Sequence, residues 1–336
     1  MKFFMENLKE NSAYNIVSPE KNASIGCNPY DIIVEKEGYS LSDTLECGQC
    51  FRHELVRDEQ GVREYVIPIG DDLVSVSQKR VGELIFKPLY DEENYRKLFD
   101  EVIAPYFTLE RDYNAIASDI IERANNDWLT EAAGAARGVA ILSQDPWETL
   151  FSFIVSQNNN IPRIRRIIRE LSIAYGVNIT LQKGIKVCPA NKISTTPCEE
   201  KCKTCGICYT FPKAEDVVRE PEKMLPSHPG FRYRYLLDAA ERVSDGRCDL
   251  ASVKARASYE HTVLELKKIV GVGDKVAACA ALSGFGNLEA FPIDVWMKRA
   301  IDTYFDGKLD HTALGPYAGI AQQYIFHYIR NIENGK

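Results

Sequence analysis

The sequence predicts an α+β protein, in which an antiparallel sheet domain of residues 1–110 precedes a mostly helical domain of residues 111–336. Between about Tyr30 and Phe107, short runs rich in β-branched residues alternate with polar or glycine-containing links, which is typical of antiparallel strands. From Asp112 onward, apolar residues recur at helical spacing behind capping residues. A sheet followed by helices places the chain in the α+β class.

Three predicted strands carry the sheet signal, at residues 31–34, 65–69 and 73–76. The links 59–61 and 70–72 precede the second and third strands, and both contain glycine. Because glycine adopts positive φ without strain, such links favour the tight turns of β-hairpins.

Capping residues mark two of the predicted helices. Asp112 opens one, and Asp145 opens another, with Pro146 in its first turn and Glu148 at the third helical position. The run after Glu148 contains enough apolar residues to form a domain core. The three asparagines at 158–160 favour a turn, so we expect that helix to end there.

Residues 264–299 show a helix, a tight turn, a second helix and a loop that leads to Asp294. The turn contains Gly271 and Gly273, which let the main chain approach a phosphate closely. Unpaired N–H groups at the start of the second helix, near Val276, point outward at an anion. We therefore expect this segment to contact a nucleic-acid backbone.

Lys275 lies in the first turn of that second helix, where the positive end of the helix dipole disfavours an ammonium. Helices favour acidic residues there, so the lysine suggests another role, such as an amine nucleophile. Asp294 follows a proline and an isoleucine, where it can cap the next helix and present a carboxylate to the same space. Two simpler interpretations stay open: Lys275 as a phosphate contact alone, and Asp294 as an N-cap alone.

The composition is that of an ordinary globular protein, with 336 residues of which 45% are hydrophobic and 26% charged. No run approaches the roughly 18 to 20 apolar residues of a membrane span, and the N-terminal apolar run is too short for a signal peptide. The sequence therefore predicts a cytoplasmic protein without a membrane partner, located on the nucleoid when it binds DNA.

The net charge of −7 counts at first against a nucleic-acid partner, because DNA affinity comes from Lys and Arg. The positive residues are locally concentrated, in three clusters: Arg163, Arg165, Arg166 and Arg169; Arg232 and Arg234; Lys267, Lys268 and Lys275. A solvated helix face is the simpler explanation of any one cluster. An enzyme that binds only a few phosphates around one base does not need a surface that is basic overall.

Five of the ten cysteines crowd into the segment 187–209: Cys188, Cys198, Cys202, Cys205 and Cys208. Four of the five are predicted to hold a structural zinc ion. An iron–sulfur cluster and a reduced loop without metal are the alternatives. Cys47 and Cys50 form a lone C-x2-C pair, which cannot fill a tetrahedral site, so we expect no metal there. No cofactor is expected for catalysis.

The runs GVGDKVAAC and FPIDVWM resemble the helix-hairpin-helix, Gly/Pro, aspartate motif of base-excision DNA glycosylases, and the lysine resembles their lyase-competent branch. Three further strings resemble the 8-oxoguanine DNA glycosylases, in the family's order: GQCFR from Gly48, QNNNI from Gln157 and GPYAGIAQ from Gly315. The resemblance extends to Phe326 and is interrupted by the segment 187–209. It implies a TBP-like sheet domain followed by a helical glycosylase domain.

The resemblance implies a monomeric DNA N-glycosylase with lyase activity at abasic sites, which removes 8-oxoguanine opposite cytosine from double-stranded DNA. Lys275 is then expected to attack C1′ and form a Schiff base, with β-elimination following. Asp294 is expected to stabilise the oxocarbenium-like transition state. The extruded base is expected between Cys279 and Phe326, with Gln322 at its Watson–Crick edge.

By the same resemblance, the carbonyl of Gly48 accepts the N7 hydrogen that 8-oxoguanine has and guanine lacks. Asn158 is expected to fill the vacated base stack, and Phe231 to act as a wedge. Arg163 and Arg232 are expected to hold the estranged cytosine. Core packing on its own helix is the alternative for Phe231.

The chain departs from the eukaryotic pattern at two positions, since Trp296 stands where those members have histidine and Phe231 where they have tyrosine. Two other functions stay open: a glycosylase for alkylated bases on the same fold, and a DNA-damage-binding protein without catalysis. The lysine in the hairpin argues against the first. Binding without strand cleavage would favour the second.

Overall fold

The computed structural model of the protein describes residues 14–17, 28–185 and 206–333. Its N-terminal part is a six-stranded antiparallel sheet in the order β1-β2-β6-β5-β4-β3. The strands are β1 (Asn15–Val17), β2 (Ile32–Glu35), β3 (Glu54–Glu59), β4 (Val62–Ile69), β5 (Asp72–Gln78) and β6 (Glu83–Lys87). The predicted strands correspond to β2, β4 and β5, which confirms the sheet.

Short links join β3 to β4, β4 to β5 and β5 to β6 as hairpins. The β3–β4 link has positive φ at Gln60 and Gly61, and the β4–β5 link has positive φ at Gly70. The register pairs Tyr65 with Val76, Val76 with Phe86, and Phe86 with Ile32. All four of these apolar side chains are buried, so one row of the sheet faces the core.

Helices form most of the remaining chain, as the sequence predicts. The α-helices are α2 (Leu41–Glu46), α3 (Tyr95–Leu98), α4 (Ala104–Tyr106), α5 (Tyr113–Ala124), α6 (Asp127–Ala135), α7 (Pro146–Ser156), α8 (Ile161–Tyr175), α9 (Ile179–Gln182), α11 (Ala214–Arg219), α12 (Tyr233–Ser244), α13 (Leu250–Ala255), α14 (Tyr259–Leu266), α15 (Asp274–Gly284), α16 (Val295–Tyr304) and α17 (Ala318–Glu333). Other helical turns are η2 (Glu92–Asn94), η3 (Phe99–Ile103), η4 (Pro221–Ser227), η5 (Gly230–Arg232) and η6 (His311–Tyr317).

The predicted caps form. Asp112 Oδ1 accepts from the amides of Asn114 and Ala115 at the start of α5, and Asp145 Oδ1 accepts from Glu148 N, 2.8 Å away, at the start of α7. The last helix differs from the prediction, which began it at residue 315. The 3-10 segment η6 precedes it, and the helix proper begins at Ala318.

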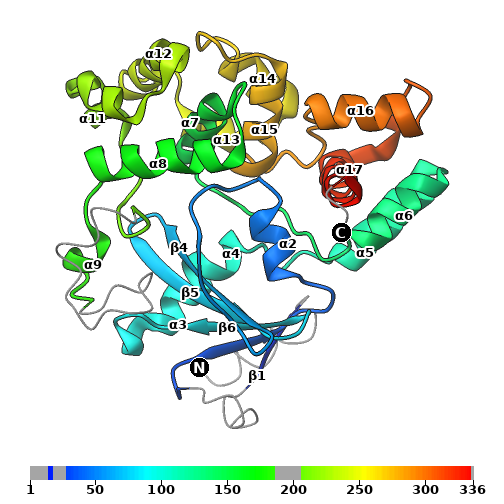
Figure 1. Ribbon diagram of the computed structural model, residues 1–336, viewed down its shortest axis with the longest axis horizontal. Helices are drawn as coiled ribbons and strands as arrows, with labels where there is room; N and C mark the ends of the chain where they lie inside the picture. The colour runs from blue at the N-terminus through cyan, green and yellow to red at the C-terminus, as the bar shows by residue number, and fades with distance from the viewer. Residues whose placement is uncertain (1–13, 18–27, 186–205, 334–336) are drawn as a thin grey trace.

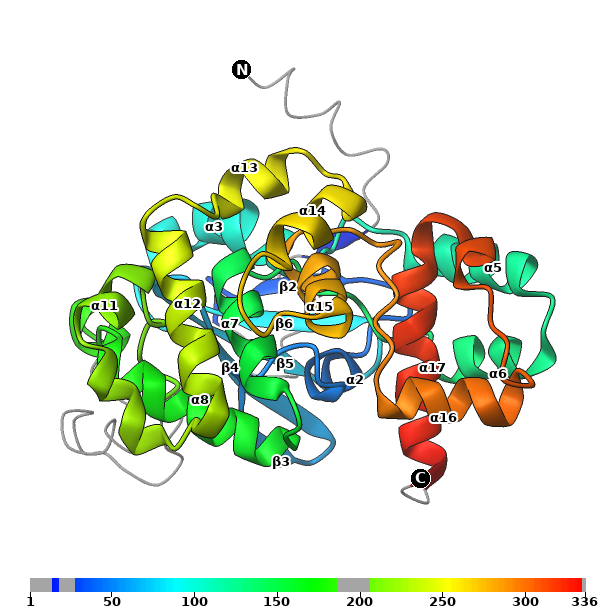
Figure 2. The ribbon, with the colours of Figure 1, turned by 90° about the horizontal axis from the view of Figure 1, so that it is seen from above.

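Two large hydrophobic clusters hold these elements together. The first joins the sheet to α5, α6 and α17, and includes Val34 of β2 and Ile325 of α17. The second lies between α7, α8, α12 and α15, and includes Phe151 and Ala277. Figures 1 and 2 show α16 and α17 grouped beside α5 and α6, while α7 and α15 lie together near the centre.

None of the helices formed by the described residues is long and apolar enough to cross a membrane.

Candidate active site

A cavity of about 550 Å³ lies where segments from both ends of the chain meet. Its walls come from the loop after α2, the turn between α7 and α8, the helix α15, the start of α16, and α17. All of the catalytic and base-pocket residues that the sequence suggests line this one space: Gly48, Lys275, Cys279, Asp294, Gln322 and Phe326. The fold therefore gathers residues that are distant along the chain.

Lys275 lies in the first turn of α15, whose N-cap residue is Gly273. Its side chain is half-buried, and its Nζ atom lies 5.1 Å from the centre of the Phe153 ring. No carboxylate of the described residues forms an ion pair with Lys275, whereas the exposed neighbour Asp274 pairs with Lys267 at 2.6 Å. The Phe153 ring thus packs beside the amine of Lys275, and both side chains line the cavity.

Asp294 caps α16 and lines the cavity at the same time. Its Oδ1 atom accepts from Met297 N at 2.9 Å. Among the described residues, no donor bonds to its second oxygen, Oδ2. The N-cap interpretation and the active-site interpretation are therefore compatible, because the cap fixes the carboxylate that faces the cavity.

Cys279 follows Lys275 by one turn of α15 and is buried. Burial raises the pKa of its thiol, and the nearby Lys275 ammonium opposes part of that rise. The side chain therefore offers the cavity a neutral, polarizable surface at neutral pH.

Gly48 has a φ of 90°, which only glycine adopts readily. A Cβ atom at this position would lie 3.3 Å from Ile161 Cδ1 and 3.9 Å from Phe326 Cε1. Any side chain here would therefore reach into the cavity wall as well as strain the backbone.

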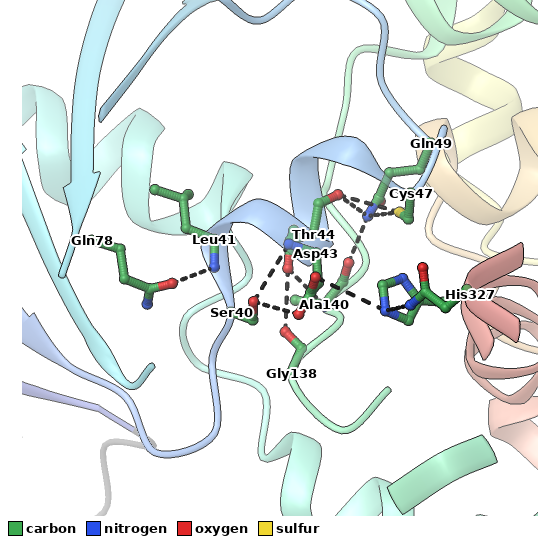
Figure 3. Close-up of polar contacts among 11 residues, drawn as sticks. Ser40, Leu41, Asp43, Thr44, Cys47, Gln49, Gln78, Gly138, Ala140 and His327 are labelled. Atoms are coloured by element: carbon green, nitrogen blue, oxygen red, sulfur yellow. Dashed lines mark hydrogen bonds and ion pairs between the residues drawn. The ribbon is translucent and has the colours of Figure 1, made fainter. Parts of the chain in front are cut away.

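The neighbouring Gln49 fixes the Gly48 loop (Figure 3). Its buried amide donates to the carbonyls of Thr44 (2.9 Å) and Ala140 (2.7 Å), and its Oε1 accepts from Leu142 N (2.8 Å). The glutamine thereby ties α2 to the segment before α7. Since the amide is buried, each of these bonds also satisfies a desolvated polar group.

A second link connects α2 with α17, near the cavity (Figure 3). His327 Nε2 lies 3.9 Å from Asp43 Oδ1 and 2.9 Å from Asn331 Nδ2. Burial lowers the pKa of His327, the Asp43 carboxylate opposes this effect, and the charge of Arg330 adds to it. The helix that carries Gln322 and Phe326 is thus joined to the element that leads into Gly48.

The side-chain amide of Gln322 is buried and held by its neighbour. Gln323 Nε2 donates to Gln322 Oε1 at 2.8 Å, which leaves the Gln322 NH₂ group to face a ligand. Gln323 Oε1 is itself buried without a partner among the described residues. Both residues line the cavity. No sequence pattern distinguishes Gln323, because its role depends on the orientation of another side chain.

Aromatic side chains form further parts of the cavity wall. Phe326 lies under the guanidinium of Arg330, whose Cζ atom is 5.3 Å from the ring centre. Trp296, which replaces the family's histidine, also lines the cavity, and Arg299 Cζ lies 5.4 Å from its ring centre. Neither Arg330 nor Phe153 was singled out from the sequence, since helical spacing alone does not show which face meets a cavity.

The residues proposed for the opposite strand lie around the turn after α7. Asn158 is exposed, has a φ of 46° and reaches the cavity rim. Phe231 is 48% exposed, which supports a surface role over core packing. Arg232 is buried, and its guanidinium donates to the carbonyls of Gln157, Asn158 and Pro229. Four of its five N–H donors are engaged, so Arg232 acts first as a brace for this turn.

The other predicted DNA contacts lie on the surface or in its backbone. Arg163 is exposed at the start of α8, where its amide donates to the Asn160 cap. Gly271 has a φ of 84°, and a Cβ there would clash with the ring of Tyr235. The side chain of Val276 is buried, so only its backbone could meet a phosphate.

The cysteines predicted to bind metal fall largely outside the described residues, since only Cys208 of the five is described. It is buried beside Ile179 and Ile207. Within the described ranges, no group of three or more His, Cys, Asp or Glu residues could hold a metal ion. Burial raises the pKa of Cys47 to about 11 and that of Cys50 further still.

Comparisons with known proteins identify the family of the chain. Residues 31–150 match the family model described as 8-oxoguanine DNA glycosylase, N-terminal domain. The chain is similar to the N-glycosylase/DNA lyase of Saccharomyces cerevisiae, with 27% identity over 290 residues that cover 80% of this chain and 69% of the yeast protein.

Two solved structures are similar over nearly the whole chain. One is MBOgg1 in complex with a low-affinity DNA ligand, with 32% identity, a TM-score of 0.73, and coverage of 96% of this chain and 99% of that chain. The other is the Clostridium acetobutylicum 8-oxoguanine glycosylase/lyase in complex with double-stranded DNA containing cytosine opposite 8-oxoguanine. For that structure the identity is 30%, the TM-score 0.72, and the coverage 91% of this chain and 96% of that chain.

Proposed function

Because the chain belongs to the 8-oxoguanine DNA glycosylase family, we propose that it removes 8-oxoguanine opposite cytosine from duplex DNA. The protein is an N-glycosylase/DNA lyase that acts on DNA. The observation that carries the proposed substrate is the meeting of an amine, a carboxylate and a base-sized pocket in one cavity. Lys275 and Asp294 line the same cavity as Gly48, Gln322 and Phe326.

In the proposed reaction, the base is flipped out of the duplex into this cavity. The neutral amine of Lys275 attacks C1′, the bond from C1′ to N9 breaks, and the departing base takes up a proton. Asp294 stabilises the positive charge that develops on the sugar, as a fixed carboxylate does best in a site shielded from water. The remaining amine proton passes to O4′ as the C1′–O4′ bond breaks, which gives a Schiff base. In the β-elimination that follows, a water takes a proton from C2′ and the C3′–O bond breaks, which expels the 3′ phosphate.

Base recognition is proposed for the groups that line the cavity. The ring of Phe326 and the thiol of Cys279 take the two faces of the base, and the Gln322 amide takes its Watson–Crick edge. The Gly48 carbonyl accepts the N7 hydrogen of 8-oxoguanine. One such bond is worth about 1 to 3 kcal/mol, so it supplies only part of the discrimination against guanine.

Recognition of the opposite strand is proposed for the turn after α7. Asn158 enters the vacated stack, and Phe231 wedges beside it. Arg163 is exposed and can donate freely to the estranged cytosine, whereas Arg232 has one N–H left for it. Backbone amides near Gly271, Gly273 and Val276 hold the phosphates of the damaged strand.

A trapping experiment tests the proposed chemistry. Borohydride should trap a covalent adduct between the protein and DNA that contains 8-oxoguanine, and Lys275→Gln should abolish it. Lys268→Gln is the matched control, because Lys268 pairs with Glu265 outside the cavity and should leave the adduct in place. An adduct that survives Lys275→Gln would overturn the assignment of the nucleophile.

The choice of lesion tests the proposed substrate. Excision of 8-oxoguanine that is faster opposite cytosine than opposite the other bases is the expected result. Excision of 3-methyladenine with no activity on 8-oxoguanine would instead favour the alkylated-base alternative. Tight lesion binding without strand cleavage would favour a non-catalytic sensor.

We also propose that four of the five cysteines between Cys188 and Cys208 hold a structural zinc ion. Thiolates at two- and three-residue spacing are a donor set that suits zinc. Metal analysis of the purified protein should find about one zinc per chain. Iron with visible absorbance would indicate the cluster, and a metal-free sample would refute both.

A further inference from the structure

Arg330 lies at the corner of the cavity where Gly48 meets Phe326. It lines the cavity, and its Nη1 atom lies 4.0 Å from the point where a Gly48 Cβ would be. Its Cζ atom lies 5.3 Å from the centre of the Phe326 ring. The guanidinium thus lies near the ring that we propose to stack on the base.

Arg330 is half-buried as a residue, yet none of the described residues forms an ion pair or a hydrogen bond with its guanidinium. The buried arginines nearby differ, since Arg52 pairs with Glu148 at 3.0 Å and Arg232 donates to backbone carbonyls. An arginine carries five donors and no acceptor. A half-buried cation that lies on the wall of a cavity and lacks hydrogen-bond acceptors indicates that an oxygen of the ligand accepts its hydrogen bonds.

The order of side chains along α17 gives the position of that oxygen. Gln322, Phe326 and Arg330 are spaced by four residues, so they follow one another along one face of the helix. The eight helical steps from Gln322 to Arg330 span about 12 Å, which suits a purine ring with a hydrogen bond at each edge. If the Phe326 ring covers the base and Gln322 takes the Watson–Crick edge, Arg330 meets the opposite edge.

The edge opposite the Watson–Crick edge of a purine carries N7 and C8. In guanine the C8 position bears a hydrogen, which accepts no hydrogen bond. In 8-oxoguanine it bears a carbonyl oxygen, next to the N7 hydrogen assigned above to the Gly48 carbonyl. Arg330 Nη1 lies 4.0 Å from the Cβ position of Gly48, so a donor lies beside the residue whose carbonyl we propose as the acceptor, and this pair matches the acceptor and donor of that edge.

We propose that Arg330 determines specificity by donating a hydrogen bond to the C8 carbonyl oxygen of the extruded base, an inference that rests on the proposed function. A guanine in the same position offers no oxygen at C8 to the guanidinium, and its N7, which is an acceptor in guanine, meets the Gly48 carbonyl with no hydrogen between them. Binding of guanine is therefore penalised at the same time as binding of 8-oxoguanine is favoured. A phosphate of the flipped nucleotide offers the same oxygen chemistry, and the experiment below separates the two sources.

The test measures the affinity for three duplexes with a 2′-fluoro sugar or an abasic analogue at the target, so that no excision occurs. The duplexes carry 8-oxoguanine, guanine and tetrahydrofuran. Arg330→Met keeps an apolar stem on Phe326 and removes the donors. The expected result is a loss of about ten-fold in affinity for the 8-oxoguanine duplex with little change for the other two.

Two variants complete the design. Arg330→Lys keeps the positive charge but replaces the planar guanidinium with an ammonium group. This variant should lose less affinity for the 8-oxoguanine duplex than Arg330→Met. Arg299→Met is the matched control, because Arg299 lies over Trp296 but does not line the cavity, and it should leave the ratio between 8-oxoguanine and guanine unchanged. Thermal unfolding at the wild-type temperature shows that each variant is folded.

The outcomes separate the inference from the proposed function. An equal loss on all three duplexes would assign Arg330 to a phosphate and overturn the inference. Unchanged affinity for 8-oxoguanine would do the same. Wild-type protein that binds 8-oxoguanine and guanine equally would instead overturn the proposed function.

Discussion

The Nζ atom of Lys275 lies 5.1 Å from the centre of the Phe153 ring, so an aromatic face from α7 supports the amine on α15. The ring is itself packed edge-on against Phe51, with 5.7 Å between the centres. The charged form of the amine over a desolvated ring is favoured by about 0.5 to 2 kcal/mol, so the contact acts before the amine loses its proton and attacks. This contact restrains a long, flexible side chain before the substrate arrives.

Replacing Phe153 with Leu should therefore slow the chemistry without unfolding the protein. We expect the rate of borohydride-trapped adduct formation to fall about five-fold, because Leu fills much of the space but offers no ring to the amine. Thermal unfolding of both proteins provides the control for packing. A variant with the wild-type trapping rate would show that the ring does not position Lys275.

Asp294 can be divided into its two roles by a pair of substitutions. Asn caps a helix as well as Asp does, so Asp294→Asn should change the free energy of unfolding little while lowering the excision rate by about 10²- to 10³-fold. Asp294→Ala should lose the same activity and about 1 kcal/mol of stability in addition. Single-turnover excision and urea unfolding measure the two effects. Full activity in the Asn variant would leave Asp294 as a cap alone.

The Gln322–Gln323 pair makes a prediction about selectivity. Gln323→Leu removes the donor that holds the Gln322 carbonyl oxygen, so the amide of Gln322 should rotate and accept alternative purines. We expect excision of 8-oxoguanine to fall several-fold relative to cleavage at a preformed abasic site, which needs no base recognition. Equal changes in the two activities would argue for a general packing defect.

Two glycines with positive φ distinguish backbone strain from steric exclusion. Gly48→Ala and Gly61→Ala should each destabilise the fold by about 1 to 2 kcal/mol, because alanine disfavours this conformation. Only Gly48→Ala adds a methyl group beside Ile161 and Phe326, since nothing lies within 4 Å of a Cβ at Gly61. We expect KM for 8-oxoguanine DNA to rise in the first variant alone. A rise in both would point to a global effect.

Burial of the Cys47 thiol predicts a dependence of stability on alkaline pH. Its pKa is raised from 9.0 to about 11, so the folded state keeps its proton after the unfolded state has lost one. The resulting stabilisation is complete below pH 9 and declines as the pH rises toward 11, by at most about 3 kcal/mol. Urea unfolding at pH 8 and pH 11 should show a smaller decline in Cys47→Ala. Parallel declines in the two proteins would contradict the prediction.

The sequence predicts the elements well where the signal is local. Asp112 and Asp145 cap helices because their carboxylates accept hydrogen bonds from amides two or three residues away. Gly61 lies in a hairpin turn because glycine adopts the positive φ that the turn requires. Lys275 stood out because it is placed against the helix dipole. The start of α17 was misplaced by three residues, since a 3-10 turn precedes it.

The contributions that come from packing were not foreseen. Phe153, Gln323 and Arg330 act through neighbours that the fold brings to them, and no spacing rule identifies those neighbours. The use of Arg232 as a brace for backbone carbonyls was missed for a similar reason, because a buried and an exposed arginine look the same in a sequence. A resemblance to a family supplied the pocket residues but not these supporting contacts.

The walls of the base pocket come from the loop near the beginning of the chain and from the helix at its end, and both are anchored in the first hydrophobic cluster. During synthesis the segment with Gly48 leaves the ribosome well before Phe326 does. The amine and carboxylate are translated before that helix exists. A partly made chain therefore has no complete pocket, and truncation within α17 should leave a protein unable to select a base, whatever remains of its hairpin.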